Sequence, residues 1–121
     1  MPLIYNKQSA QKLTINIGLD NNPFKGVESH LPHYIASLLP VCGGQYKIRV
    51  GEYNGLPEST FIYTVMLNIL EPQLARVLEV LCMALDQECI AYRYGHREKL
   101  VYNPFFKGYR NLFNSDYFLE G

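Results

Sequence analysis

The apolar residues of this chain recur with two different periods. In residues 12–19 and again in residues 45–53, every second side chain is apolar along most of the segment. Residues 59–70 are rich in β-branched and aromatic side chains, which favour strands, although their second face is less polar than a solvated face. A period of two places alternate side chains on opposite faces, so these segments predict three strands that each turn one face to a core.

Two other segments carry apolar residues at helical spacing. From residue 27 to residue 39 they fall on one stripe of a helix, but Pro32 is tolerated only in a first turn. This helix is therefore expected to start near Ser29 or His30. A second stripe follows Pro72, a residue suited to a first helical position, and predicts a helix up to about Leu85.

The remaining connections complete a recognisable order. Asn54 and Gly55 favour a hairpin, and the following Leu56 and Pro57 predict a loop longer than the tightest kind. Residues 88–95 predict a fourth strand, and residues 96–102 a short fifth strand or an extended edge. The order strand, helix, strand, strand, helix, strand predicts an α+β, ferredoxin-like sandwich: a four-stranded antiparallel sheet with both helices on one face.

The composition fits one folded domain. The 121 residues are 48% hydrophobic and 18% charged, and we expect a core over about residues 12–102 with an aromatic C-terminal extension over 103–121. Eleven basic and eleven acidic side chains give zero formal charge, so no overall field draws the chain to nucleic acid or to an anionic membrane.

The cysteine count and the start of the chain bear on its location. Three cysteines are an odd number, and residues 1–13 do not show a basic segment followed by an apolar run, so we expect no signal peptide and a reducing, cytoplasmic setting. The apolar runs are far shorter than the roughly 20 residues of a membrane-spanning helix, so no membrane partner is expected.

The densest group of reactive side chains lies in residues 81–100. Cys82 falls on the apolar stripe of the second helix, where a thiol behaves as a small hydrophobe, and its spacing to Cys89 does not suit zinc. Asp86 and Glu88 are expected in a solvated turn after the helix. His96 lies a whole strand further on.

Recognisable catalytic and cofactor motifs are missing. His30 and His33 are three residues apart but have no third ligand at an obvious spacing, and neither glycine-rich phosphate loops nor a nucleophile elbow is found. We therefore predict no catalytic, cofactor-binding or metal-binding residue. A small enzyme that uses His30, His33 or the region around Asp86 and Glu88 stays open as an alternative.

The sheet face turned away from the helices, called the outward face below, is the more informative feature. Its expected members on the first three strands are Thr14, Asn16, Lys47, Arg49, Thr60, Ile62, Thr64 and Met66. The fourth strand adds either Ile90, Tyr92 and Tyr94 or Ala91 and Arg93. Basic and aromatic residues on an open sheet are typical of domains that bind single-stranded RNA, but residues 59–67 lack the glycines and the basic residue of that motif.

The outward face is therefore expected to be covered by the aromatic C-terminal segment or by a second copy of the chain. Burying a few hundred square ångströms of apolar surface at ~25 cal/mol/Å² favours a dimer or a higher assembly. The expected interaction residues are Lys47, Arg49, Ile62, Met66, Tyr92, Arg93, Phe105, Phe106, Tyr109, Phe113, Tyr117 and Phe118.

Several runs of the sequence, INIGLDNN, GEYNGLPESTFIYTVML and LEVLCMALDQECIAY, have the order found in a known group of proteins. Together they resemble small bacterial and phage proteins of ferredoxin-like design over about residues 13–94. The resemblance implies a fold and no catalytic residue.

The leading hypothesis is a non-catalytic binding module that associates with itself and contacts an unidentified protein or a small ligand. Single-stranded nucleic-acid binding through Lys47, Arg49, Tyr92 and Arg93 is the alternative.

Overall fold

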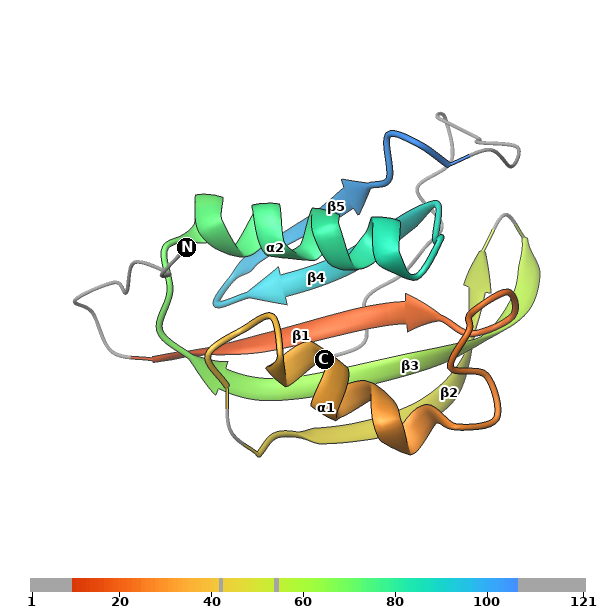
Figure 1. Ribbon diagram of the computed structural model, residues 1–121, viewed down its shortest axis with the longest axis horizontal. Helices are drawn as coiled ribbons and strands as arrows, with labels where there is room; N and C mark the ends of the chain where they lie inside the picture. Colours follow the sequence, from red (N-terminus) through yellow and green to blue (C-terminus); the bar gives the residue numbers. More distant parts are fainter. Residues whose placement is uncertain (1–9, 42, 54, 107–121) are drawn as a thin grey trace.

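The fold is a curved sheet with two helices packed on one side of it. A computed structural model describes residues 10–41, 43–53 and 55–106. The strands are β1 (Gln11–Gly18), β2 (Gln45–Tyr53), β3 (Leu56–Leu67), β4 (Cys89–Tyr94) and β5 (Arg97–Tyr102), and the helices are α1 (Leu31–Ala36), after a 3-10 turn at Glu28–His30, and α2 (Glu71–Ala84). The strands form one antiparallel sheet in the order β2-β3-β1-β4-β5 (Figure 1).

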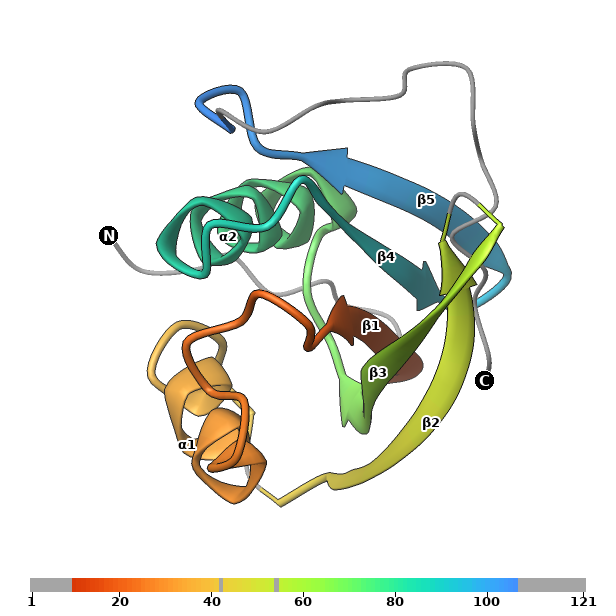
Figure 2. The same ribbon diagram turned by 90° about the vertical axis from the view of Figure 1, so that its right-hand side faces the viewer.

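The core lies between the sheet and the helices. Figure 2 shows both helices on the concave side of the sheet. Alternate residues of β1, β3 and β4 point into this core, as the period of two predicted. They are Leu13, Ile15, Ile17, Phe61, Tyr63, Val65, Leu67, Ile90, Tyr92 and Tyr94. The helices add Leu31, Ile35, Leu74, Leu78, Leu81 and Cys82.

The predicted four-stranded ferredoxin-like sheet is wrong, because the sheet has five strands. β5 pairs along its whole length with β4, from Tyr94 opposite Arg97 to Cys89 opposite Tyr102. A tight turn makes this return possible: Gly95 has a φ of 62°, a conformation that glycine adopts without a steric penalty. The α+β class is confirmed.

The hairpin between β2 and β3 is also tighter than predicted. Tyr53 pairs with Leu56, so only two residues connect the strands, and Gly55 has a φ of 79°. Leu56 and Pro57 therefore belong to β3 and not to the loop.

Helix α1 is shorter than the apolar stripe from residue 27 to residue 39 suggested. Its six residues begin at Leu31, with Pro32 in the first turn as predicted. On the helix side of β2, the side chains of Tyr46, Ile48 and Val50 are 40%, 47% and 69% exposed. A six-residue helix thus leaves the β2 end of the concave face partly uncovered.

The described part of the chain contains no helix that is long and apolar enough to cross a membrane.

Candidate ligand pocket at the start of helix α2

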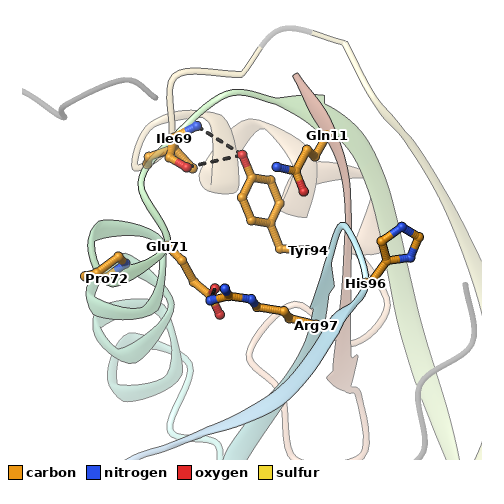
Figure 3. A pocket seen from close by; sticks show the side chains of 7 residues that line it. All are labelled: Gln11, Ile69, Glu71, Pro72, Tyr94, His96 and Arg97. Carbon is orange, nitrogen blue, oxygen red and sulfur yellow. Dashed lines mark hydrogen bonds and ion pairs between the residues drawn. The ribbon is translucent and has the colours of Figure 1, made fainter. Parts of the chain in front are cut away.

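A pocket of about 480 Å³ opens where α2 begins, beside the β4–β5 hairpin. Its walls come from four parts of the chain: the start of β1, the β3–α2 connection, the first turn of α2 and the hairpin. The lining residues are Gln11, Ile69, Glu71, Pro72, Tyr94, His96 and Arg97. Figure 3 shows Arg97 reaching toward Glu71, with His96 across the pocket from Pro72.

Tyr94 fixes the connection that forms the back of the pocket. Its hydroxyl lies 2.9 Å from the Leu67 carbonyl and 3.2 Å from the Ile69 carbonyl, and it accepts a hydrogen bond from the Ile69 N–H at 3.1 Å. Tyr94 is 5% exposed and Ile69 is fully buried. The hydroxyl therefore bonds to backbone groups at the end of β3 and in the β3–α2 connection, and these bonds hold this wall in place.

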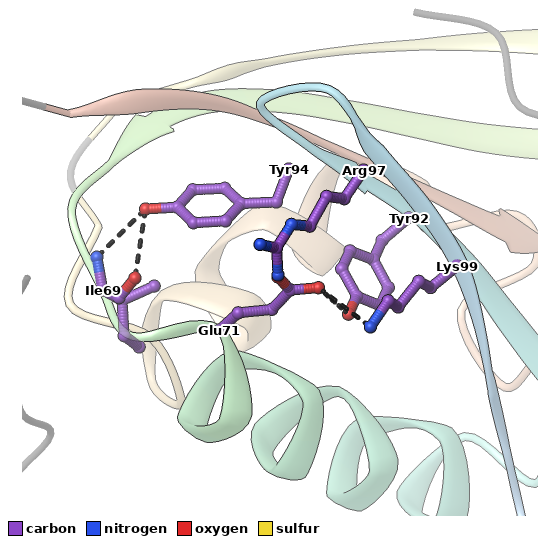
Figure 4. Close-up of polar contacts among 6 residues, drawn as sticks. All are labelled: Ile69, Glu71, Tyr92, Tyr94, Arg97 and Lys99. Carbon is purple, nitrogen blue, oxygen red and sulfur yellow. Dashed lines mark hydrogen bonds and ion pairs between the residues drawn. The ribbon is translucent and has the colours of Figure 1, made fainter.

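Glu71 is the charged centre of the site. Arg97 Nη1 lies 2.6 Å from Glu71 Oε1, while the Tyr92 hydroxyl and Lys99 Nζ lie 3.2 Å and 3.5 Å from Oε2 (Figure 4). The Glu71 side chain is 14% exposed. Its place in the first turn of α2 also puts a negative charge where the helix dipole favours one.

These partners decide the protonation states. Burial acts to raise the pKa of Glu71, but hydrogen bonds from Arg97 and Tyr92 and the charges of Lys99 and Arg97 outweigh it and hold the pKa below its ordinary value. Burial, together with the charge and the hydrogen bond of Glu71, raises the pKa of Tyr92 to about 12. At neutral pH, Glu71 is thus a carboxylate and Tyr92 a hydroxyl donor.

The alternation of β5 explains why two cations meet one carboxylate. Arg97 and Lys99 are two residues apart on the strand, so both point to the side on which α2 lies. They stand directly opposite Tyr94 and Tyr92 of β4. The β4–β5 hairpin and the first turn of α2 are therefore joined by charge as well as by packing.

A second carboxylate lies in a different environment, at the far end of β1. Both oxygens of Glu58 lie 2.8 Å from the position that a Cβ of Gly18 would take, so the carboxylate occupies the space that a side chain would fill. Burial, and then the charge of Asp20, raise the pKa of Glu58 to about 7. This group can be protonated or ionised near neutral pH.

The structure divides the expected interaction residues between two faces. Lys47 and Arg49 are exposed and Met66 is 60% exposed, whereas Ile62 is 2% exposed. Tyr92 lies in the core and bonds to Glu71. The open choice on β4 is thereby answered: Ile90, Tyr92 and Tyr94 face the helices, and Ala91 and Arg93 lie on the outward face.

Other members of the outward face are more buried than an open face would allow. Thr14, Asn16 and Thr60 are at most 4% exposed, although both helices lie on the other side of the sheet. Arg93 pairs with Glu98 at 3.0 Å. Phe105 is 75% exposed and Phe106 is partly exposed. Tyr109, Phe113, Tyr117 and Phe118 lie outside the described residues.

The reactive side chains of residues 81–100 do not come together in one site. Cys82 is fully buried, as its helical position predicted, and Cys89 is 5% exposed. Asp86 is exposed at a turn with a φ of 51°. The expectation of a solvated turn is wrong for Glu88, which is 9% exposed: it directly precedes β4, and Asn103 donates its N–H to the Glu88 carbonyl.

The histidines of the sequence lie apart from the pocket, with one exception. His30 and His33 are exposed beside the start of α1. Within residues 10–41, 43–53 and 55–106, no three His, Cys, Asp or Glu side chains converge as metal ligands would. His96 stands at the rim of the pocket.

Sequence reasoning missed Glu71, Arg97 and Tyr94 as members of one site. Two signals were present: an acidic residue directly before Pro72 at a helix start, and alternating cations on a possible fifth strand. Neither says that the two segments meet.

Comparisons with known proteins add a likeness to a solved structure. Neither the models of protein families nor the curated proteins give a match. A solved structure of a phage SAM lyase in complex with S-methyl-5'-thioadenosine is similar, with 11% sequence identity and a TM-score of 0.49. The alignment covers 88% of this chain and all of that one. At this identity and TM-score the likeness carries no conclusion about activity.

Proposed function

We propose that this protein is a non-catalytic binding module whose ligand site is the pocket at the start of α2. The pocket itself supports this proposal: its volume of about 480 Å³ lies in the range of small-molecule sites, and the side chains of Gln11, Glu71, His96 and Arg97 converge on it beside Pro72. A small ligand is one of the partner classes expected from the sequence.

The hydrogen bonds that the polar side chains of the pocket already make favour ligand binding over catalysis. Glu71 already accepts hydrogen bonds from Arg97 and Tyr92 and pairs with Lys99, and its lowered pKa makes it a poor general base. The Tyr94 hydroxyl is engaged with the backbone at Leu67 and Ile69. Groups that are tied in this way can orient a ligand, but they are badly placed to exchange protons with it.

A fragment screen by protein-observed NMR tests the proposal. We expect small organic fragments to shift the resonances of Ile69, Tyr94 and Arg97. Pro72→Trp, a change at an exposed lining residue, should abolish these shifts by filling the pocket, whereas Glu79→Trp on an exposed part of the same helix should not. Fragments that bind elsewhere, or binding that persists in Pro72→Trp, would contradict the proposal.

Self-association is a second candidate function, and the row formed by Tyr46, Ile48 and Val50 on β2 favours it. These side chains are 40% to 69% exposed at an edge of the sheet, and exposed apolar surface at an edge strand favours association with another chain. Sedimentation at tens of micromolar should show a dimer or a larger species that Ile48→Glu disperses. The same change at Met66, exposed on the outward face, is the matched control.

A further inference from the structure

We infer that the pocket at the start of α2 binds a small organic anion, a carboxylate or a phosphate monoester on a compact apolar body, with Arg97 as the residue that receives the anionic group. This inference rests on the proposed binding function and specifies the chemical class of its ligand.

The balance of charge around the pocket is the first argument. Glu71 contributes one negative charge, while Arg97 and Lys99 contribute two positive charges within 3.5 Å of its oxygens. The cations also lie nearer to the solvent: the side chains of Arg97 and Lys99 are 70% and 56% exposed, against 14% for Glu71. Lys99 does not line the pocket, so a ligand that enters from solvent meets the guanidinium of Arg97 before it meets Glu71.

The hydrogen-bonding capacity of the side chains points the same way. The Glu71 carboxylate is already surrounded by Arg97, Lys99 and the Tyr92 hydroxyl, and as a carboxylate it only accepts hydrogen bonds. A guanidinium has five N–H donors, and the described contact of Arg97 with Glu71 uses one nitrogen of its fork. The remaining donors suit a carboxylate or phosphate, which arginine binds in a bidentate manner.

The apolar wall defines the rest of the ligand. Ile69 and the ring of Tyr94 form the back of the pocket, and Pro72 forms one side. Pro72 is the exposed apolar residue of this lining, whereas Ile69 is fully buried and Tyr94 is 5% exposed, so these two support the wall from behind. A ring-sized apolar body that packs on Pro72, with one anionic substituent directed to Arg97, fits this lining.

A cationic ligand is disfavoured by the same geometry. To reach Glu71, an ammonium group would have to displace Arg97 from its 2.6 Å contact and then lie beside two like charges. The ligand's ammonium group would then replace the Arg97 guanidinium as the partner of Glu71, and the number of ion pairs would not increase.

The test is an NMR titration of the full chain with four probes of one shape: benzoate, phenyl phosphate, benzylamine and benzyl alcohol. We expect benzoate or phenyl phosphate to shift the Ile69, Tyr94 and Arg97 resonances, with affinities at least about tenfold higher than those of benzylamine and benzyl alcohol, as one charge-assisted contact supplies. The ratio of benzoate to phenyl phosphate affinity identifies which anion the site prefers.

Variants of the two arginines of the β4–β5 hairpin, Arg93 and Arg97, provide the controls. Arg97→Gln should weaken anion binding by about tenfold, and Arg97→Lys by less, because lysine keeps the charge but loses the bidentate geometry. Arg93→Gln removes a cation of the same hairpin that pairs with Glu98 outside the pocket, and it should leave binding unchanged. Thermal unfolding of each variant verifies that the fold persists.

The outcomes separate the ligand class from the binding function. Tighter binding of benzylamine or benzyl alcohol in the pocket would overturn the anion inference and leave the binding module standing. A failure of all four probes, together with a fragment screen that gives no pocket shifts, would overturn both. An equal loss of anion affinity in Arg93→Gln would also overturn the role given to Arg97.

Discussion

Two partly buried glutamates at opposite ends of the fold behave in opposite ways. Glu71, at the start of α2, is ringed by Arg97, Lys99 and the Tyr92 hydroxyl, and its pKa is lowered. Glu58, at the start of β3, lies over Gly18 with Asp20 as its charged neighbour, and its pKa is raised to about 7.

The difference shows that burial alone does not set the charge of a carboxyl group. Burial acts to raise both pKa values, and the neighbours decide the outcome. The decisive neighbours of Glu71 come from β5, the strand that the four-stranded prediction left out. A strand added at the edge of a sheet has thus changed the chemistry at the start of a helix.

The largest expected effect comes from removing the charged centre of the pocket. Glu71→Leu leaves the Tyr92 hydroxyl without its acceptor and two cations beside one another, so we expect the free energy of unfolding to fall by about 2 kcal/mol. Urea denaturation at pH 7 measures it. Glu98→Leu, which breaks the exposed pair with Arg93, should cost less than about 1 kcal/mol. Equal losses in the two variants would show that the Glu71 cluster is an ordinary surface pair.

A smaller effect is expected from Glu58, and it depends on pH. Between its ordinary pKa of 4.5 and about 7, the folded chain keeps a proton on Glu58 that the unfolded chain releases. Stability from this group is therefore present below pH 4.5 and is lost as the pH rises through about 7. Because the side chain is only half-buried, we expect a loss of about 1–2 kcal/mol, less than the full shift would give.

Urea denaturation of the parent chain and Glu58→Gln from pH 4 to pH 8 isolates this contribution. The free energy of unfolding of Glu58→Gln should not show this loss as the pH rises, so the variant should be the more stable chain at pH 8. The contribution of Glu71 to stability has the opposite pH dependence. Because its pKa is lowered in the folded chain, it contributes stability above pH 4.5 that is lost in acid. Parallel stability curves for the parent chain and Glu58→Gln would show that the carboxyl group of Glu58 titrates normally.

The smallest effect on stability is expected from Gly18→Ala. The added Cβ would lie 2.8 Å from both Glu58 oxygens, which are the movable end of a flexible side chain. We expect the carboxylate to move toward solvent and its pKa to fall toward 4.5, while the free energy of unfolding changes by less than about 1 kcal/mol. A carboxyl-carbon NMR titration follows the pKa directly. A pKa that stays near 7 would mean that the space over Gly18 does not control it.

The elements of the fold were largely predictable because their signals are local. Alternation in β1 and β2 and helical spacing in α2 depend on residues a few positions apart, and these elements lie close to where the sequence placed them. The number of strands was harder to predict. Residues 97–102 have a short, highly charged pattern, and only their pairing with β4 makes them a strand.

The candidate site could not be predicted in the same way. Glu71 and Arg97 are 26 residues apart, and their contact depends on how α2 lies over the hairpin. The environment of Glu58 likewise depends on its packing over Gly18, 40 positions earlier in the sequence. Sequence patterns indicate which face of an element is apolar, but they do not indicate which charged groups will meet.

The two edges of the sheet also differ, and this difference bears on how far any assembly would grow. β5 presents three consecutive charged residues, Arg97, Glu98 and Lys99, all exposed. Charges on an edge strand oppose the addition of another strand, since they would have to be stripped of water or paired. The β2 edge also carries exposed charges, Lys47 and Arg49, but its apolar row lies on the concave side of the sheet. We therefore expect an assembly built on the apolar row of β2 to close as a pair, because the charged β5 edge opposes the addition of a further strand.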